Sequence, residues 1–256
     1  MTVIVLTSAG HAPGVTTTAV GLAVSWSRPV LLVDADPHPT QSVLAGYLQG
    51  TDPFGRGLAA LLSAHRERRP LAGLLDEAAL DLVAEPSDLV SRRFLPGFGN
   101  PGMVDLFSAA WPEFAAALAG TAADVLVDAG RLGPRGLPPA LLEVADLVGV
   151  VTRTSLVDLV ALRVQLPLLT EALPPERLGL ALVGPDRPYT AKEIQAQFGL
   201  EVVASVSWAP EQARVWSHGD RPTRRFRLGH QRSVQHAATG LLERVTARSA
   251  LIGAPR

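Results

Sequence analysis

The feature that most constrains the fold is the segment 2–23, TVIVLTSAGHAPGVTTTAVGLA, in which a strand pattern, a loop and a helix pattern follow one another. Residues 3–6 form a short apolar run, and residues 8–14 contain the glycines and the proline of a turn. A strand that leads through such a loop into a helix can surround an anion with backbone N–H groups. The segment therefore predicts an α/β fold with a phosphate-binding loop.

The rest of the chain repeats this alternation of short apolar runs and helical patterns. Several of the runs are apolar throughout, which is typical of strands buried on both faces. The alternation predicts right-handed crossover units, and hence a doubly wound, mainly parallel sheet flanked by helices. Strands are expected at 3–6, 30–33, 80–83, 93–95, 125–127, 148–151, 178–183 and 202–206, and helices at 15–27, 40–48, 57–64, 103–119, 138–144, 155–172, 190–198, 210–217 and 231–248.

No composition shift divides the chain, so a single domain over residues 1–256 is expected. The segment 50–102 is the least regular. It is either an insertion over one face of the sheet or, as we favour, a set of connecting helices and surface loops. In parallel sheets ligands bind beyond the carboxyl ends of the strands, which directs attention to the loops after residues 6, 33, 127, 183 and 206.

Composition excludes several classes of protein. The net charge of −1 and the pI of about 6.6 give no overall attraction to nucleic acid or membranes. The chain has no cysteine, which excludes disulfides and thiolate metal sites. Neither a secretory signal nor an apolar run long enough to span a membrane is visible, so a cytoplasmic protein is expected. Lys192 is the single lysine among 23 basic residues.

The loop sequence resembles the deviant Walker A motif, KGGVGKTTTA, of the ParA/MinD-type P-loop ATPases (the SIMIBI class). The resemblance aligns Thr16 with the hydroxyl that binds magnesium and Gly14 with the last glycine of the loop. Val15 stands where that family has its phosphate-binding lysine, and Gly10 where it has the lysine that reaches across the dimer. The predicted nucleotide-binding loop is Gly10, His11, Ala12, Pro13, Gly14, Val15, Thr16 and Thr17.

These replacements weaken the expected anion site. Pro13 lacks an N–H donor, and His11 and Ala12 add side chains where backbone normally approaches the ligand. Losing a charge-assisted contact commonly costs about 2–5 kcal/mol. The loop is therefore either a fold-preserving turn with weak or absent nucleotide binding, which we favour, or a substituted site that still binds ATP with Mg²⁺.

Acidic residues follow two of the predicted strands. VLLVDADPHPTQ at 30–41 resembles the motif LLVDxDPQGN of the same family, and ADVLVDAG at 123–130 resembles its Walker B strand. The resemblance implies that Asp36 and Asp128 are catalytic, and that Asp34, Asp128 and Thr16 place magnesium. The alternative for such carboxylates is that they cap the next helix. Arg131 and Arg135 follow the Walker B strand, and one of them could replace the lost lysine, unless both are merely solvated.

Later segments follow the same template. ADLVGVVT at 145–152 resembles a family strand, and the resemblance implies that Arg187 and Pro210 lie near the adenine base. A cluster of arginines lies near the C-terminus, and it predicts either non-specific DNA binding or only a solvated face. The chain's last helix is too weakly apolar for direct membrane insertion. The arginines proposed to contact DNA are Arg214, Arg221, Arg224, Arg225 and Arg227.

Two hypotheses of function follow from the resemblance. The first is a partitioning or positioning protein with weak or lost ATP turnover, a pseudo-ATPase. As a homodimer it would be a scaffold that localises DNA or a membrane, pilus or secretion machine through a protein partner or cargo. Pilus-associated proteins of the CpaE/TadZ type also have lysine-less loops. The second is an active ATPase whose dimerisation requires ATP. Whether the chain is an enzyme stays open at this point.

Overall fold

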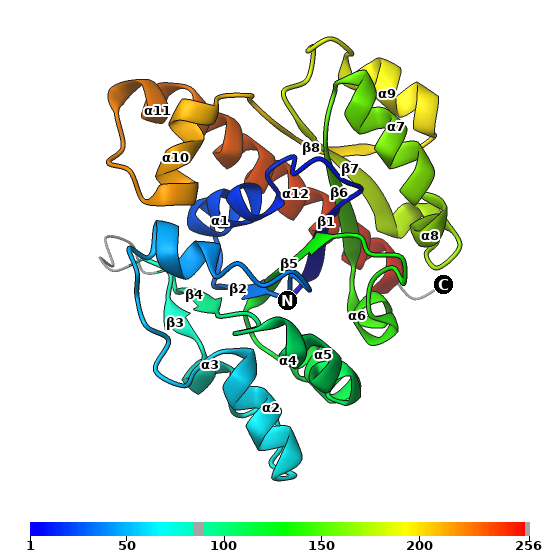
Figure 1. Cartoon of the computed structure of the whole chain (residues 1–256). Helices are drawn as coiled ribbons and strands as arrows, with labels where there is room; N and C mark the ends of the chain where they lie inside the picture. The colour runs from blue at the N-terminus through cyan, green and yellow to red at the C-terminus, as the bar shows by residue number, and fades with distance from the viewer. Residues whose placement is uncertain (84–89, 254–256) are drawn as a thin grey trace.

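The computed structural model describes residues 1–83 and 90–253, and the side chains among these up to residue 248. An eight-stranded sheet in the order β3-β4-β2-β5-β1-β6-β7-β8 forms its centre (Figure 1). All neighbouring strands are parallel except β3, which pairs antiparallel with β4 at the edge. The strands are β1 (Val3–Ser8), β2 (Val30–Asp34), β3 (Leu80–Asp81), β4 (Arg92–Leu95), β5 (Asp124–Arg131), β6 (Leu147–Arg153), β7 (Leu178–Val183) and β8 (Val202–Val206).

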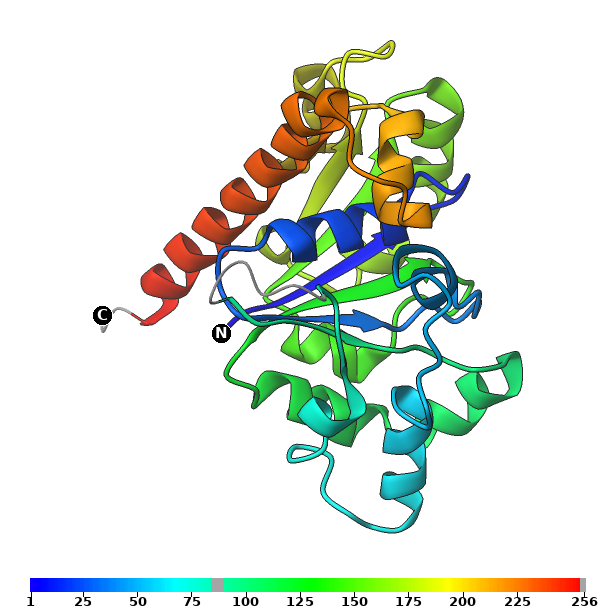
Figure 2. The same cartoon turned by 90° about the vertical axis from the view of Figure 1, so that its left-hand side faces the viewer.

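Helices cover both faces of the sheet and bury two separate apolar cores. One face carries α1 (Val15–Ser25), the π-helical turn η1 (Val43–Tyr47), α10 (Pro210–His218), α11 (Arg224–Leu228) and α12 (His230–Gly253). In Figure 2, the long helix α12 runs obliquely down one side of the molecule, and it packs against α1. The other face carries α2 (Leu58–Arg66), α3 (Leu75–Ala78), α4 (Pro101–Leu106), the 3₁₀ turn η2 (Phe107–Ala109), α5 (Trp111–Ala119), α6 (Pro139–Val144), α7 (Leu156–Gln165), α8 (Pro167–Thr170), the 3₁₀ turn η3 (Pro175–Arg177) and α9 (Ala191–Phe198).

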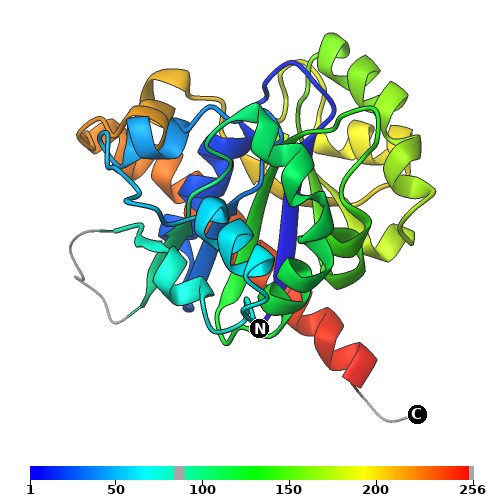
Figure 3. The ribbon, with the colours of Figure 1, turned by 60° about the horizontal axis from the view of Figure 1, so that its bottom comes forward.

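The predicted doubly wound fold is confirmed, and the eight strands lie where the apolar runs placed them. Strands with every residue buried, such as β1 and β7, explain the continuous apolar runs. The segment 50–102 supplies α2, α3, the edge strand β3 and its neighbour β4, together with the loops that connect them. The cyan and green helices between residues 58 and 119 lie in front of the sheet in Figure 3.

Prolines explain two differences from the predicted helices. The helix expected over 103–119 is three short elements, and Pro112 lies in the first turn of the last of them, α5. The helix expected over 155–172 ends as α7, and α8 restarts at Pro167. Proline has no N–H for the preceding turn and is tolerated only where a helix begins. The short helices α3 and α11 were not expected.

Among residues 1–83 and 90–253, no helix has both the length and the apolar character that crossing a membrane requires. The last three residues of the C-terminal tail, which entered the prediction about membranes, lie outside the described residues.

Candidate nucleotide site

The loop between β1 and α1 keeps the backbone of a glycine-rich loop without most of its glycines. Gly14 precedes α1 with φ 98°, in the left-handed region. His11 and Ala12 also have positive φ, 56° and 45°, although both carry a Cβ. A non-glycine residue in this region costs about 1–2 kcal/mol. The chain therefore maintains a strained loop conformation that glycine would adopt freely.

Val15, which the resemblance aligns with the family's lysine, contributes apolar packing. Its side chain is only 6% exposed and belongs to the core between the sheet and α1. The neighbouring Thr16 is half-buried, and its hydroxyl donates a hydrogen bond to the Asp128 carboxylate. Pro13 is buried, whereas Thr17 is half-buried. The loop therefore retains its hydroxyls and the N-terminus of α1 but no cation of its own.

The three predicted carboxylates meet at the carboxyl end of β2 and the adjoining part of β5. Asp34 and Asp128 are register partners across these two strands. Asp36 lies directly over Gly130, because a Cβ built on Gly130 would be 2.2 Å from the Asp36 carboxyl carbon. Gly130, with φ 59°, also donates its N–H to Asp128 at 2.9 Å. Only glycine fits this position, since a side chain would collide with Asp36.

Burial without a neighbouring cation alters the proton affinity of two of these groups. Burial, and next the negative charge of Asp128, raise the pKa of Asp34 to about 7. Burial also raises the pKa of Asp128 to about 6, although hydrogen bonds from Thr16 and Gly130 partly oppose the shift. Protonation therefore begins to remove the negative charge of Asp34 as the pH falls through about 7, and that of Asp128 as it falls through about 6.

The donor set fits Mg²⁺ only together with a phosphate ligand. Oxygen donors from Thr16, Asp34 and Asp128 are the kind that Mg²⁺ prefers. Within the described ranges, however, no group of three acidic or histidine side chains could hold a metal ion by itself. Mg²⁺ usually keeps several waters and binds through one or two carboxylates plus substrate phosphates. A nucleotide would therefore have to bring the ion's remaining ligands.

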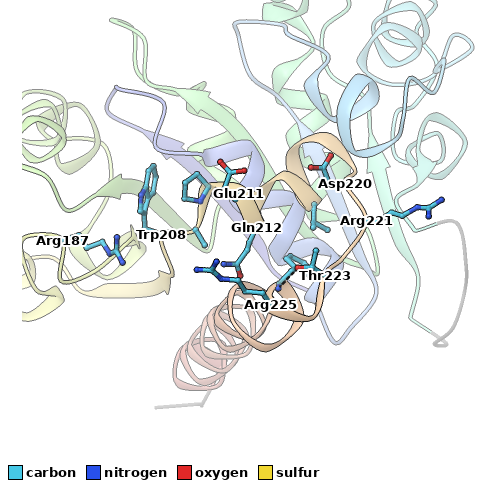
Figure 4. Close-up of a pocket in the computed structure, with 12 residues that line it drawn as sticks. Arg187, Trp208, Glu211, Gln212, Asp220, Arg221, Thr223 and Arg225 are labelled. Atoms are coloured by element: carbon cyan, nitrogen blue, oxygen red, sulfur yellow. Dashed lines mark hydrogen bonds between the residues drawn. The ribbon is translucent and has the colours of Figure 1, made fainter.

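The two residues predicted near the base line one cavity. Arg187 follows β7, and Pro210 begins α10. Both line a cavity of about 490 Å³ together with Trp208, which lies beside Arg187 in Figure 4. Arg187 and Trp208 also line a second cavity of about 290 Å³. An aromatic ring beside a guanidinium can hold a planar, negatively charged ligand.

Arg153, at the end of β6, was missed by sequence reasoning. Its Nη2 donates to the carbonyl oxygen of Ala12 at 2.9 Å, and its guanidinium lies 4.5 Å from the centre of the Trp208 ring. The available signal was its position directly after the segment ADLVGVVT at 145–152. The loops expected to carry the site follow five other strands, and the end of this strand is not among them.

Arg131 and Arg135, the predicted substitutes for the lysine, are exposed. The backbone of Arg131 lies beside Ser8 of β1, and Arg135 lies 3.7 Å from the Asp105 carboxylate. Both line a cavity of about 890 Å³ together with His38 and Trp111.

The C-terminal arginines do not form one uniform patch. Arg214 forms an ion pair with Asp220 at 2.7 Å. Arg221 and Arg225 line opposite sides of the 490 Å³ cavity and point apart in Figure 4. Arg224, Arg225 and Arg227 belong to α11 and are exposed.

A doubly wound parallel sheet whose first strand leads through a turn-rich loop into a helix, with Asp34 at the end of β2 and Asp128 beside it in β5, is the architecture of the P-loop fold. Solved structures agree. A ParA family ATPase from Chlorobium tepidum TLS is 18% identical, with a TM-score of 0.69 over 97% of this chain and 98% of that one. The protein has the ParA/MinD fold.

Two further structures, both with MinD in their names, have TM-scores above 0.6. MinD from Pyrococcus horikoshii OT3, complexed with Mg-ADP, is 19% identical with a TM-score of 0.63, over 98% of this chain and 97% of that one. A chain of the MinC:MinD complex of Aquifex aeolicus is 16% identical with a TM-score of 0.68, over 95% and 96%. No protein-family model matches the chain, and no curated protein matches it in sequence.

Proposed function

We propose that this protein is a ParA/MinD-like partitioning or positioning protein of the cytoplasm, with weak or lost ATP turnover. It acts as a single domain and a homodimer, and as a scaffold that localises DNA or a membrane, pilus or secretion machine. The observation that carries the proposal is a phosphate-type loop that keeps its backbone conformation while Val15 fills the position of the lysine. Phosphoryl transfer depends on positioning and on charge neutralisation, so the loss of the lysine's positive charge lowers the rate of ATP turnover.

A surface feature supports a role in assembly. Exposed apolar side chains follow one another along α7 and α8, where each is between 36% and 68% exposed. Contiguous apolar surface on a folded protein is typical of a face that meets another protein. The residues are Leu156, Val157, Val160, Val164 and Leu168.

The second candidate is an active ATPase that dimerises with ATP and uses a substituted loop. The surviving hydroxyls, the oxygen donors at Asp36 and Asp128, and the arginines near the loop favour it. In that case Thr16 and Asp128 organise Mg²⁺, Asp36 orients the attacking water, and Arg131 or another arginine supplies the charge.

Calorimetric titration with MgATP and MgADP, with light scattering and a phosphate-release assay alongside, separates the two. We expect no binding tighter than about millimolar, which corresponds to about −4 kcal/mol. We also expect no turnover and an oligomeric state that ignores ATP. Micromolar binding with ATP-dependent dimerisation and turnover would replace the first candidate by the second.

A matched pair of variants shows whether any residual binding uses the loop. Thr16→Val removes the hydroxyl that contacts Asp128, whereas Thr170→Val removes an exposed hydroxyl on α8. Binding in the loop is lost in the first variant and retained in the second. Equal affinities would show that the nucleotide binds elsewhere.

A further inference from the structure

The strained loop needs an external support. His11 and Ala12 are consecutive, exposed and left-handed, with φ 56° and 45°. Side chains with a Cβ favour other conformations, and such strain persists only where the surroundings over-determine it. A contact from outside the loop is therefore needed to hold these two residues in a conformation that glycine would adopt freely.

The contact comes from Arg153. This residue ends β6, the strand beside β1. Its Nη2 donates a hydrogen bond of 2.9 Å to the carbonyl oxygen of Ala12, the second of the two strained residues. A carbonyl that is bonded to a guanidinium cannot rotate freely, so the peptide that follows Ala12 is held in place.

Arg153 is itself held by Trp208. The guanidinium lies 4.5 Å from the centre of the indole, the geometry of a cation–π contact. Trp208 in turn lies against Gly184, where an added Cβ would be 2.7 Å from the Trp208 Cβ. Thr154, the residue after Arg153, makes two further contacts. Its hydroxyl lies within hydrogen-bond distance of the Gly184 carbonyl oxygen, at 2.7 Å, and of the Arg187 carbonyl oxygen, at 2.9 Å. The loops after β1, β7 and β8 are thus joined at the end of β6.

We propose that Arg153 is a positioning residue that holds the phosphate-type loop in its left-handed conformation, with Trp208 as the platform for its guanidinium. Its hydrogen bond stabilises a backbone conformation that glycine would adopt without support. In this conformation the loop N–H groups are available to an anion. This inference goes beyond the proposed function, because the conformation of the loop exists and can be measured without a nucleotide.

The test compares Arg153→Ala in two backgrounds by backbone NMR of the protein without ligand. In the natural sequence, the variant is expected to shift or broaden the amide signals of residues 10–12 and 14–16, because the loop leaves the left-handed region. In an Ala12→Gly background the same variant should leave these signals nearly in place, since glycine needs no support there. This dependence on residue 12 separates support of the loop from a general packing role.

Controls keep the outcome decisive. Arg163→Ala removes an exposed arginine from α7 and should leave the loop signals unchanged in both backgrounds. Arg153→Lys keeps a donor and a charge but loses the planar contact with Trp208, so a partial effect is expected. If Arg153→Ala lowers stability too far, Arg153→Lys and Trp208→Leu carry the comparison. Loop signals that do not move, or that move equally in both backgrounds, would overturn the proposal.

A second readout requires measurable nucleotide binding, which the proposed function makes weak or absent, and it is interpreted separately. Where MgADP binding is measurable, Arg153→Ala should weaken it about tenfold, because only a fraction of the molecules then holds the competent loop. The Ala12→Gly background should restore most of the loss. If MgADP does not bind at all, the NMR comparison still decides the role of Arg153.

Discussion

Val15 is the residue whose replacement tests the loop most directly. The backbone before it has positive φ at His11, Ala12 and Gly14, and Val15 adds no charge to this loop. We expect Val15→Lys to tighten MgATP binding at least about tenfold, or about 1.4 kcal/mol, and to lower the melting temperature because an apolar side chain leaves the core. Calorimetry and thermal unfolding measure the two effects.

The control for this change is Val24→Lys, which adds the same charge to a half-buried position on the same helix, away from the loop. It should leave nucleotide affinity unchanged. Unaltered affinity in Val15→Lys would place the defect in the side chains of His11 and Pro13 rather than in the missing charge.

Asp34 predicts an unusual dependence of stability on pH. Its pKa of about 7 in the folded protein lies above the 3.8 of the unfolded chain, so folding takes up a proton between these values. The stabilising contribution is complete at low pH and is lost as the pH rises through 7. Asp128, with a pKa of about 6, adds a loss in the same direction at slightly lower pH.

Asp34→Asn should therefore raise the free energy of unfolding more at pH 8 than at pH 5, by on the order of 2–4 kcal/mol, since one pKa unit is about 1.4 kcal/mol. Denaturant unfolding of the variant and the natural protein, at both pH values and without Mg²⁺ or nucleotide, gives the difference. Asp105→Asn changes an exposed carboxylate and should show no such trend. An Asp34→Asn effect that is equal at both pH values would contradict the raised pKa.

At the scale of elements, α1 packs closely against α10 and α12. A Cβ on Gly21 would lie 3.1 Å from Val234 of α12 and 3.2 Å from the Trp216 indole nitrogen of α10. We expect Gly21→Ala to destabilise the protein by about 1–3 kcal/mol through overpacking.

Gly240→Ala is the matched control, because no atom lies within 4 Å of its added Cβ on α12. It should stabilise the protein by about 0.5–1 kcal/mol through helix propensity. Denaturant midpoints of both variants give the comparison. A neutral Gly21→Ala would mean that α1 can move away from α10 and α12 without cost.

The elements also show what the sequence could predict. β7 is apolar throughout and β1 is apolar over its first four residues, so their pattern is unambiguous, and the position of the aspartates after the predicted strands follows from strand direction alone. The backbone of His11 and Ala12 could not be predicted, since their residue types disfavour positive φ and the hydrogen bond to Ala12 comes from Arg153, which is distant in sequence. The raised pKa values likewise depend on burial, which the sequence does not give.

For the whole molecule, the net charge of −1 means that any contact with DNA must be local. If α11 tracks phosphates, the combined Arg224→Ala, Arg225→Ala and Arg227→Ala variant should weaken binding to random duplex. It should also lower the salt slope by about 0.9 for each phosphate that the variant no longer neutralises. Fluorescence anisotropy over a salt series measures both.

The comparison variant removes Arg66, Arg68 and Arg69, which lie at the end of α2 and just after it, on the other face of the sheet. It carries the same change in net charge and should bind DNA as the natural protein does. An equal loss in both variants would indicate a general charge effect and no surface at α11.

The junction at the end of β6 has a consequence for thermodynamic linkage. Arg153 contacts the loop after β1 and the indole after β8 at the same time, so these regions are joined through one side chain. A molecule that competes for the face of Trp208 would loosen the loop at Ala12, and an anion that orders the loop would strengthen the contact with Trp208. Coupling between binding sites is reciprocal. The free energy by which a molecule at Trp208 weakens anion binding in the loop therefore equals the free energy by which the anion weakens binding of that molecule at Trp208.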